Sequence, residues 1–168
     1  MHYISKYNSP FGEITIASDG DCVIGLWFEG QKYFAATLNE NCSEKELPIF
    51  HNIKMWLDDY FAGKNSPMNE QISLKGSPFQ QAVWRVLQRI PYGHMMTYGE
   101  VANVVAKELG KRWMSAQAVG NAVGHNPISI VVPCHRVVGS NGKMVGYAGG
   151  IERKIGLLKL EQSDLLEK

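Results

Sequence analysis

The chain has 168 residues, 45% of them hydrophobic, and a formal net charge of +1 at pH 7. This length allows one or two small domains, and the composition is typical of a globular protein rather than a disordered or fibrous one. No stretch approaches the roughly 18 apolar residues of a transmembrane helix, and the first residues contain no apolar run typical of a signal peptide. We therefore expect a cytoplasmic protein with no membrane partner.

The first half of the chain predicts a β-rich unit followed by a helix. Alternation over 13–17 and an apolar run over 22–28 predict hairpin strands, with turn residues between them. Apolar residues at helical spacing predict a helix over 48–61. Because the sequence from 64 to 76 is polar and irregular, we expect a domain boundary there, with domains over 1–75 and 76–168.

The second half is predicted to be mostly helical. Two segments, Ser77 to Gln80 and Thr97 to Glu100, are typical of capping boxes and predict helices beginning near 78 and 98. The first would end by Pro91, the second would continue to Gly110, and a third is expected over about 114–125. Two short helices joined by a turn suggest a helix-turn-helix.

The third of these helices is lined with small residues, namely Ala116, Ala118, Gly120, Ala122 and Gly124. A glycine in a helix costs about 1 kcal/mol relative to alanine, so another backbone is expected to approach closely. A neighbouring helix is the commoner explanation, and a DNA strand is the alternative. The charge distribution also allows two interpretations, because residues 76–168 carry 11 Lys and Arg against 6 acidic residues, whereas residues 1–75 carry 6 Lys against 10 acidic residues. The basic half could attract a phosphate backbone, or it could be a solvated surface with uneven charge.

One of the three cysteines has unusual neighbours. The apolar run 128–132 predicts a short strand that Pro133 ends, so that Cys134 would lie where a buried strand emerges into a loop. His135 offers a base and Arg136 a positive charge, and nearby positive charge lowers the pKa of a cysteine. We therefore predict that Cys134 is an activated nucleophile. The other two cysteines lack such neighbours, and the wide spacing of all three indicates neither a disulfide framework nor a zinc site.

Four segments together resemble the 6-O-alkylguanine-DNA alkyltransferases: Asn-Pro-Ile at 126–128, Pro-Cys-His-Arg-Val at 133–137, Gly-Tyr-Ala-Gly-Gly at 146–150 and Leu-Leu-Lys-Leu-Glu at 157–161. The resemblance covers about residues 77–161, in order and at nearly fixed spacing, and the first half only loosely. It implies an α+β fold, with a β-rich, ribonuclease-H-like N-terminal domain and a mostly helical, winged-helix-like C-terminal domain.

The resemblance implies catalytic roles for five residues. Cys134 would take the alkyl group of 6-O-alkylguanine, with 4-O-alkylthymine as a second candidate donor, and keep it, in a single turnover without a cofactor. His135 would accept the thiol proton through a water, oriented by Glu161. Asn126 would fix the turn beside the cysteine, and Tyr98 would donate a proton or hydrogen bond to the departing guanine. Judged from the residues alone, a solvated helix residue is the preferred interpretation of Glu161, and Tyr98 could be a half-buried packing residue.

The resemblance also implies how double-stranded DNA would be held. The damaged base must be flipped out, and the small-residue helix would enter the minor groove, which is about 6 Å wide. Many relatives carry an arginine that fills the place of the flipped base, where this chain has Gln117, and Lys111 or Arg112 could assist. The residues expected to contact DNA or the base are Arg112, Ala116, Gln117, Ala118, Gly120, Arg136, Tyr147, Ala148 and Gly149.

Two other functions remain open at this point. One is a non-catalytic sensor of alkylated DNA, which would need neither Cys134 nor Glu161. The other is a thiol hydrolase or redox protein built on Cys134 and His135, which would not need the small-residue helix. We expect a monomer, and we expect no transcriptional role, because the sequence shows no additional metal-binding N-terminal domain like that of regulatory relatives.

Overall fold

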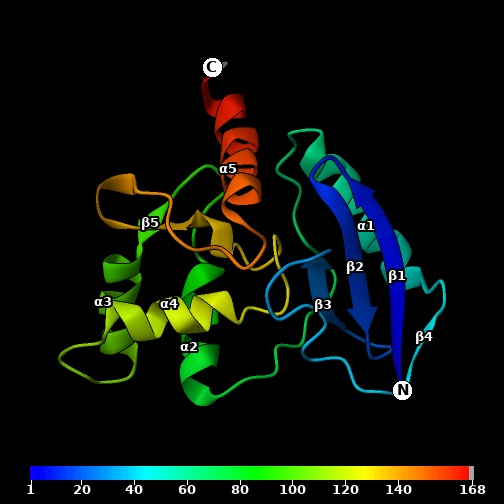
Figure 1. The fold of residues 1–168 in the computed structure, drawn as a ribbon, viewed down its shortest axis with the longest axis horizontal. Coiled ribbons are helices and arrows are strands. Elements are labelled where there is room, and N and C mark those ends of the chain that lie inside the picture. Colours follow the sequence, from blue (N-terminus) through cyan, green and yellow to red (C-terminus); the bar gives the residue numbers. More distant parts are fainter. Residues whose placement is uncertain (167–168) are drawn as a thin grey trace. The chain divides into compact units, whose positions relative to one another are not determined.

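The computed structural model describes residues 1–166, and the side chains of residues 1–162. The chain forms two compact units (Figure 1). The first contains residues 1–75 together with 127–129, and the second contains residues 76–126 together with the chain from 130 onward. The mixed α+β fold class is confirmed by the elements of both units. Within the described residues, every helix is too short or too polar to cross a lipid bilayer.

The first unit contains a four-stranded sheet. Its strands are β1 (His2–Ser9), β2 (Gly12–Ser18), β3 (Val23–Phe28) and β4 (Cys42–Glu44), in the spatial order β3-β2-β1-β4. Both hairpin pairings are antiparallel, and β4 runs parallel to β1. The predicted strands over 13–17 and 22–28 are confirmed as β2 and β3. All six residues of β3 are buried, which explains why that strand is apolar throughout rather than alternating.

The helix of the first unit, α1 (Pro48–Phe61), lies where the apolar spacing predicted it. Pro48 occupies its first turn, where the missing N–H costs no hydrogen bond. Its buried face consists of Ile49, Phe50, Ile53, Leu57 and Tyr60.

The segment 127–129 adds to the edge of β3 in this first unit. The backbone N–H of Leu26 donates to the carbonyl of Pro127 at 2.9 Å, and the N–H of Ser129 donates to the carbonyl of Leu26 at 3.0 Å. The predicted strand over 128–132 is nevertheless wrong, because only Ile128 forms a bridge. Ile130 has a φ of 70°, a left-handed conformation that an extended strand cannot contain.

The second unit is mostly helical, as predicted. It contains α2 (Pro78–Leu87), α3 (Tyr98–Glu108), α4 (Ala116–Gly124) and α5 (Ile151–Leu166), with two short parallel strands, β5 (Met96–Thr97) and β6 (Val137–Val138). Helices α2, α3 and α4 pack against one another. Residues 109–115 join α3 to α4, which gives the helix-turn-helix arrangement.

Both predicted capping boxes are present in this unit. The Ser77 hydroxyl accepts from the N–H of Gln80 at 3.1 Å, and the Gln80 side chain accepts from the N–H of Ser77 at 3.0 Å. Thr97 and Glu100 do the same at the start of α3. Each box satisfies two N–H groups that a helix start would otherwise leave unpaired, so both helices begin where the sequence places them.

Candidate active site

Cys134 lies in the second unit at the start of a single 3-10 turn, Cys134–Arg136, directly after Pro133. It is 3% exposed, and its N–H donates to the carbonyl of Val132 at 2.8 Å. The same carbonyl accepts from the side-chain amide of Asn126 at 2.8 Å, and Asn126 also hydrogen-bonds the Cys134 side chain. Asn126 therefore braces the turn that leads to the cysteine. The expected strand end before Cys134 is absent, and this turn takes its place.

Burial raises the pKa of the Cys134 thiol. A hydrogen bond with Asn126, the charge of Lys154 and the nearby Tyr147 side chain act in the opposite direction without outweighing it. This corrects the prediction that positive neighbours lower this pKa, because desolvation is the larger effect here. A thiol that is protonated at neutral pH needs a base at the moment of reaction.

His135, the next residue along the chain, is the candidate for that base. It is fully buried, and its Nε2 lies 2.5 Å from Oε2 of Glu161. Since a carboxylate can only accept, Nε2 carries the hydrogen and Nδ1 presents a lone pair. Among the described residues, none hydrogen-bonds Nδ1. Burial lowers the pKa of His135 against the opposing effect of Glu161, so the ring is neutral and able to accept a proton.

Glu161 and Arg136 form a buried ion pair next to this histidine. The Arg136 guanidinium donates to both oxygens of Glu161, at 2.7 and 3.2 Å, and to the carbonyl of Ile90 at 2.6 Å. Burial alone would raise the pKa of Glu161, but the hydrogen bonds from His135 and Arg136 lower it to about 2. The predicted DNA contact of Arg136 does not fit this placement, because its guanidinium is committed to partners inside the unit.

Tyr98 and Lys154 meet at the segment that follows β6. The Tyr98 hydroxyl donates to the carbonyls of Val145 and Gly146, at 3.2 and 3.4 Å. The Lys154 ammonium donates to the same two carbonyls, both at 3.0 Å, and lies 5.6 Å from the centre of the Tyr98 ring. Burial raises the pKa of Tyr98 to about 12 and lowers that of Lys154 to about 8.

Lys154 is fully buried and was missed by the sequence reasoning. A signal did exist, because Lys154 and Glu161 are seven residues apart on α5 and therefore share one helix face. A lysine on the same face as apolar residues and a predicted catalytic carboxylate could have been singled out.

The glycine-rich segment 146–150 returns the chain to this cluster. Gly146 and Gly150 have φ values of 56° and 96°, which favour glycine. A Cβ on Gly146 would lie 3.8 Å from the Tyr98 hydroxyl. Tyr147 lies near enough to Cys134 to lower the pKa of its thiol, Ala148 is half-buried, and Gly149 is buried with its carbonyl accepting from Arg153 at 3.2 Å.

Helix α4 has two different faces. Val119, Ala122 and Val123 are buried, and the carbonyl of Ala122 accepts from the indole N–H of Trp84 at 2.9 Å. Small residues on this face serve packing. The opposite face is open: Ala116 and Gln117 are exposed, Ala118 is half-buried, and a Cβ on Gly124 would meet no atom within 4 Å.

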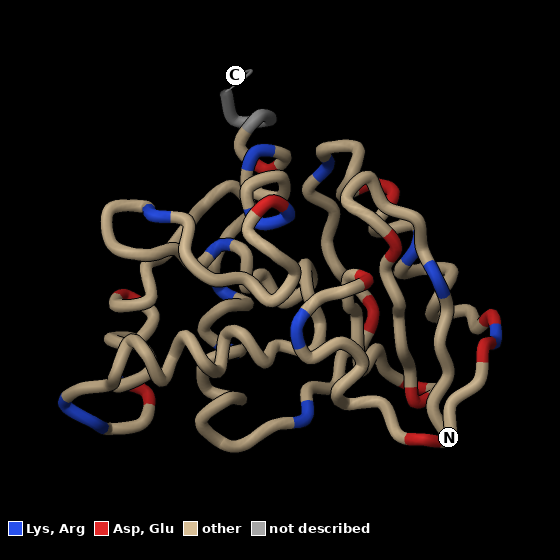
Figure 2. Tube along the Cα trace, viewed as in Figure 1, with Lys and Arg blue, Asp and Glu red and all other residues tan. Residues whose placement is uncertain are grey.

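Gly120 lies between these two faces. A Cβ there would lie 3.8 Å from the Tyr98 ring, so this part of α4 passes close to the cluster around Cys134. The turn before the helix carries the exposed cations Lys111 and Arg112 (Figure 2). The open face of α4 therefore adjoins both the candidate site and a positively charged turn.

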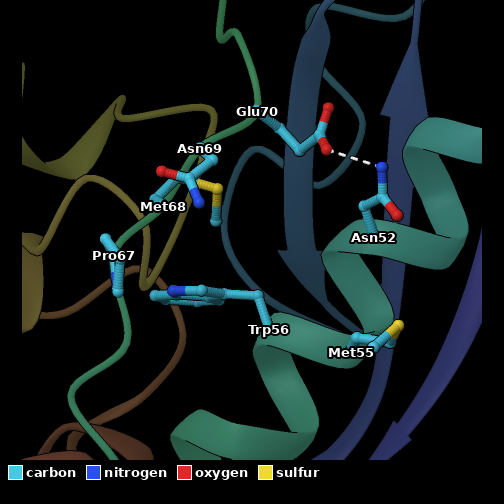
Figure 3. Close-up of a pocket in the computed structure, with 7 residues that line it drawn as sticks. All are labelled: Asn52, Met55, Trp56, Pro67, Met68, Asn69 and Glu70. Carbon is cyan, nitrogen blue, oxygen red and sulfur yellow. Dashed lines mark hydrogen bonds between the residues drawn. The ribbon is translucent and has the colours of Figure 1, made fainter.

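A separate hollow lies on the first unit (Figure 3). Its lining comprises Asn52, Met55, Trp56, Pro67, Met68, Asn69 and Glu70. The amide of Asn52 donates to Glu70 across it at 2.7 Å. It contains no predicted site residue and no nucleophile. Among the described residues, no group of three His, Cys, Asp or Glu side chains could hold a metal ion.

Two family models match the chain. Residues 2–74 match the ribonuclease-like domain of 6-O-methylguanine DNA methyltransferase, and residues 78–163 match the DNA binding domain of the same family. The methylated-DNA–protein-cysteine methyltransferase of Mycobacterium tuberculosis (strain ATCC 25618 / H37Rv) is 40% identical over 163 residues, which cover 97% of this chain and 93% of that relative. The constitutive enzyme of that name from Bacillus subtilis (strain 168) is 37% identical over 171 residues and the whole of both chains.

Solved structures show the same likeness. The crystal structure of Mycobacterium tuberculosis OGT in complex with DNA superposes with a TM-score of 0.82 at 40% identity, covering 96% of this chain and 93% of that one. A structure of the Mycobacterium tuberculosis O6-methylguanine methyltransferase also gives a TM-score of 0.82.

Proposed function

Because the chain belongs to the 6-O-methylguanine DNA methyltransferase family, we propose that it repairs DNA by direct reversal, moving an alkyl group from 6-O-alkylguanine to the sulfur of Cys134. The observation that carries this proposal is the buried pair of His135 and Glu161 beside a protonated thiol. The pair provides the base that such a thiol needs. A thioether has no good leaving group, so each molecule reacts once.

The proposed reaction begins with the proton of the Cys134 thiol. It passes through a bridging water to Nδ1 of His135, and the charge of Glu161 stabilises the resulting imidazolium. The thiolate attacks the alkyl carbon, so that a carbon–sulfur bond forms as the carbon–oxygen bond breaks. The bonding electron pair leaves with guanine, which takes up one proton in place of the one the thiol lost.

The departing base requires a hydrogen-bond donor, because negative charge develops on it. Tyr98 suits this role, since its raised pKa keeps the hydroxyl protonated at any pH at which the protein acts. Asn126 holds the turn that presents Cys134. We assign the segment of Tyr147, Ala148 and Gly149 to the base pocket.

DNA would be bound by the second unit. The proposal places the open face of α4, with Ala116, Gln117, Ala118 and Gly120, in the minor groove, and Arg112 against a phosphate. The first unit would act as a support domain. We further propose that 4-O-alkylthymine is a second substrate. We also propose that the protein is a monomer and acts in the cytoplasm.

The two alternative functions are less well supported. A lesion sensor needs no base, yet His135 and Glu161 are buried and paired, and the relatives are named as methyltransferases. A hydrolase or redox protein would not need the open, small-residue face of α4.

The test is a mass spectrum after incubation with duplex DNA that contains one 6-O-methylguanine. We expect one methyl group per protein, a gain of about 14 Da that maps to Cys134, because the thioether cannot regenerate. Cys134→Ser should abolish the gain, whereas Cys22→Ser and Cys42→Ser, at partly and fully exposed positions, should leave it unchanged. Many turnovers per molecule, or a methyl group on Cys22 or Cys42, would contradict the proposal.

A further inference from the structure

Two donors share two acceptors beside the reactive cysteine. The Tyr98 hydroxyl and the Lys154 ammonium both donate to the carbonyls of Val145 and Gly146. The lysine bonds are the shorter, at 3.0 Å against 3.2 and 3.4 Å. An ammonium has three N–H donors, so Lys154 can satisfy both carbonyls by itself.

The proposed reaction requires Tyr98 to change partners. A tyrosine hydroxyl has one hydrogen to donate, and in this structure that hydrogen is directed at loop carbonyls. To assist the departing base, it must leave them. Leaving would cost these carbonyls a hydrogen bond, which opposes the change unless another donor remains.

The surroundings of Lys154 indicate that it has a functional role. Within residues 1–162, no carboxylate forms an ion pair with this buried ammonium. An unpaired buried charge is costly to a fold and is usually retained for a reason other than stability. Its neighbours are the two carbonyls and the Tyr98 ring.

We propose that Lys154 is a positioning residue that keeps the Val145 and Gly146 carbonyls hydrogen-bonded when the Tyr98 hydroxyl leaves them for the departing guanine. This inference rests on the proposed function of the Cys134 site. Lys154 acts through Tyr98 and does not itself touch the alkyl group. Without the Lys154 amine, Tyr98 is the one of these two donors that remains on the carbonyls. Release of the Tyr98 hydroxyl is then unfavourable.

The test compares two methyl donors on the full chain. Transfer from 6-O-methylguanine in duplex DNA needs a donor to the leaving base, whereas methyl iodide releases an iodide ion that needs none. Single-turnover rates at saturating DNA are measured for wild type, Lys154→Met, Tyr98→Phe and the double variant. Lys159→Met, at an exposed position of the same helix, is the matched control and should behave as wild type.

We expect Lys154→Met to slow transfer from guanine by about ten-fold, the size of a lost hydrogen bond, while the methyl iodide rate falls much less. In the Tyr98→Phe background, Lys154→Met should cause little further loss, because no hydroxyl remains to be released. Affinity for undamaged duplex should not change. If the methionine variant melts below the assay temperature, the same comparison is made at a temperature below its melting point.

Equal losses with both methyl donors, or additive losses in the double variant, would overturn the role assigned to Lys154. A different result marks failure of the proposed function itself: wild-type protein would be methylated on Cys134 by methyl iodide but not by methylguanine DNA.

Discussion

Glu161 contacts the side chains of His135 and Arg136, and the two contacts have different effects. Its bond with His135 fixes which ring nitrogen carries the hydrogen, whereas its bonds with Arg136 neutralise a buried cation. A carboxylate with a pKa of about 2 stays charged in both roles at neutral pH. Removing the whole side chain would therefore mix a loss of activation with the cost of an unpaired guanidinium. Glu161→Gln, which keeps the shape, is the cleaner change.

The activating pair should behave as a unit in kinetics. We expect His135→Ala to slow alkyl transfer roughly a hundred-fold or more, the usual contribution of a general base. Combining it with Glu161→Gln should add little, because Glu161 acts through the histidine. Single-turnover rates for the single and double variants measure this, with affinity for undamaged duplex as the control. Fully additive losses would leave Glu161 only a structural role.

For single residues, the sequence predicted well which side chains belong to the site, but it predicted their ionisation poorly. Cys134, His135 and Glu161 carry motif signals, and the fold pairs Glu161 with the histidine that follows Cys134 in the chain. The predicted DNA contact of Arg136 does not fit its placement, because its guanidinium pairs with Glu161, 25 residues further along the chain. The lowered cysteine pKa failed because burial, which local sequence does not report, exceeds the effect of neighbouring charges.

At the scale of elements, α4 shows how one short helix serves two surfaces. Ser115 caps it by accepting from the N–H of Ala118 at 3.2 Å, and its buried face packs on α2 and α3. The remaining face is free for a ligand. Gln117 is exposed in the first turn of the helix, where the proposal places the minor groove.

Gln117 should matter only when a base must leave a duplex. Unstacking costs a few kcal/mol, and a glutamine amide can both donate to and accept from the orphaned partner base. We expect Gln117→Ala to slow repair of duplex DNA several-fold more than repair of a single strand, and Gln117→Arg to be tolerated. Alkyl-transfer rates on matched substrates check this, with the exposed Gln88→Ala as control. Equal slowing on both substrates would rule out a base-replacing role.

Helix starts were predictable because their signals are local. The capping boxes at Ser77 and Thr97 each lie within four residues and need no partner elsewhere. The strand expected over 128–132 failed for the opposite reason. Its residues favour β-structure, but a strand needs a neighbour, and only Ile128 reaches β3 before the chain turns at Ile130.

At the scale of the whole molecule, charge is divided along the chain. The acidic excess falls on residues 1–75 and the basic excess on residues 76–168, which form most of the second unit. Two of the eleven basic residues, Arg136 and Lys154, are not available to DNA, since they are buried. Net charge by segment therefore overstates the number of phosphate contacts, and the exposed turn of Lys111 and Arg112 is the better guide.

Binding to undamaged duplex should weaken as salt rises, because bound phosphates release counterions. We expect Arg112→Ala to reduce the slope of log affinity against log salt by about one contact. Lys32→Ala, which removes an exposed cation from the first unit, should leave the slope unchanged. Titrations over a range of salt concentrations provide the measurement. An affinity independent of salt would mean that the basic residues are merely solvated.

The protonated, enclosed state of Cys134 bears on how long an unused molecule lasts. Peroxides and stray electrophiles attack thiolates that solvent can reach, and this sulfur at rest is neither ionised nor exposed. A protein that reacts once is consumed as surely by oxidation as by its substrate. A thiol that stays protonated and buried until a lesion binds therefore keeps more protein molecules active. The consequence is a slower intrinsic reaction of the thiol.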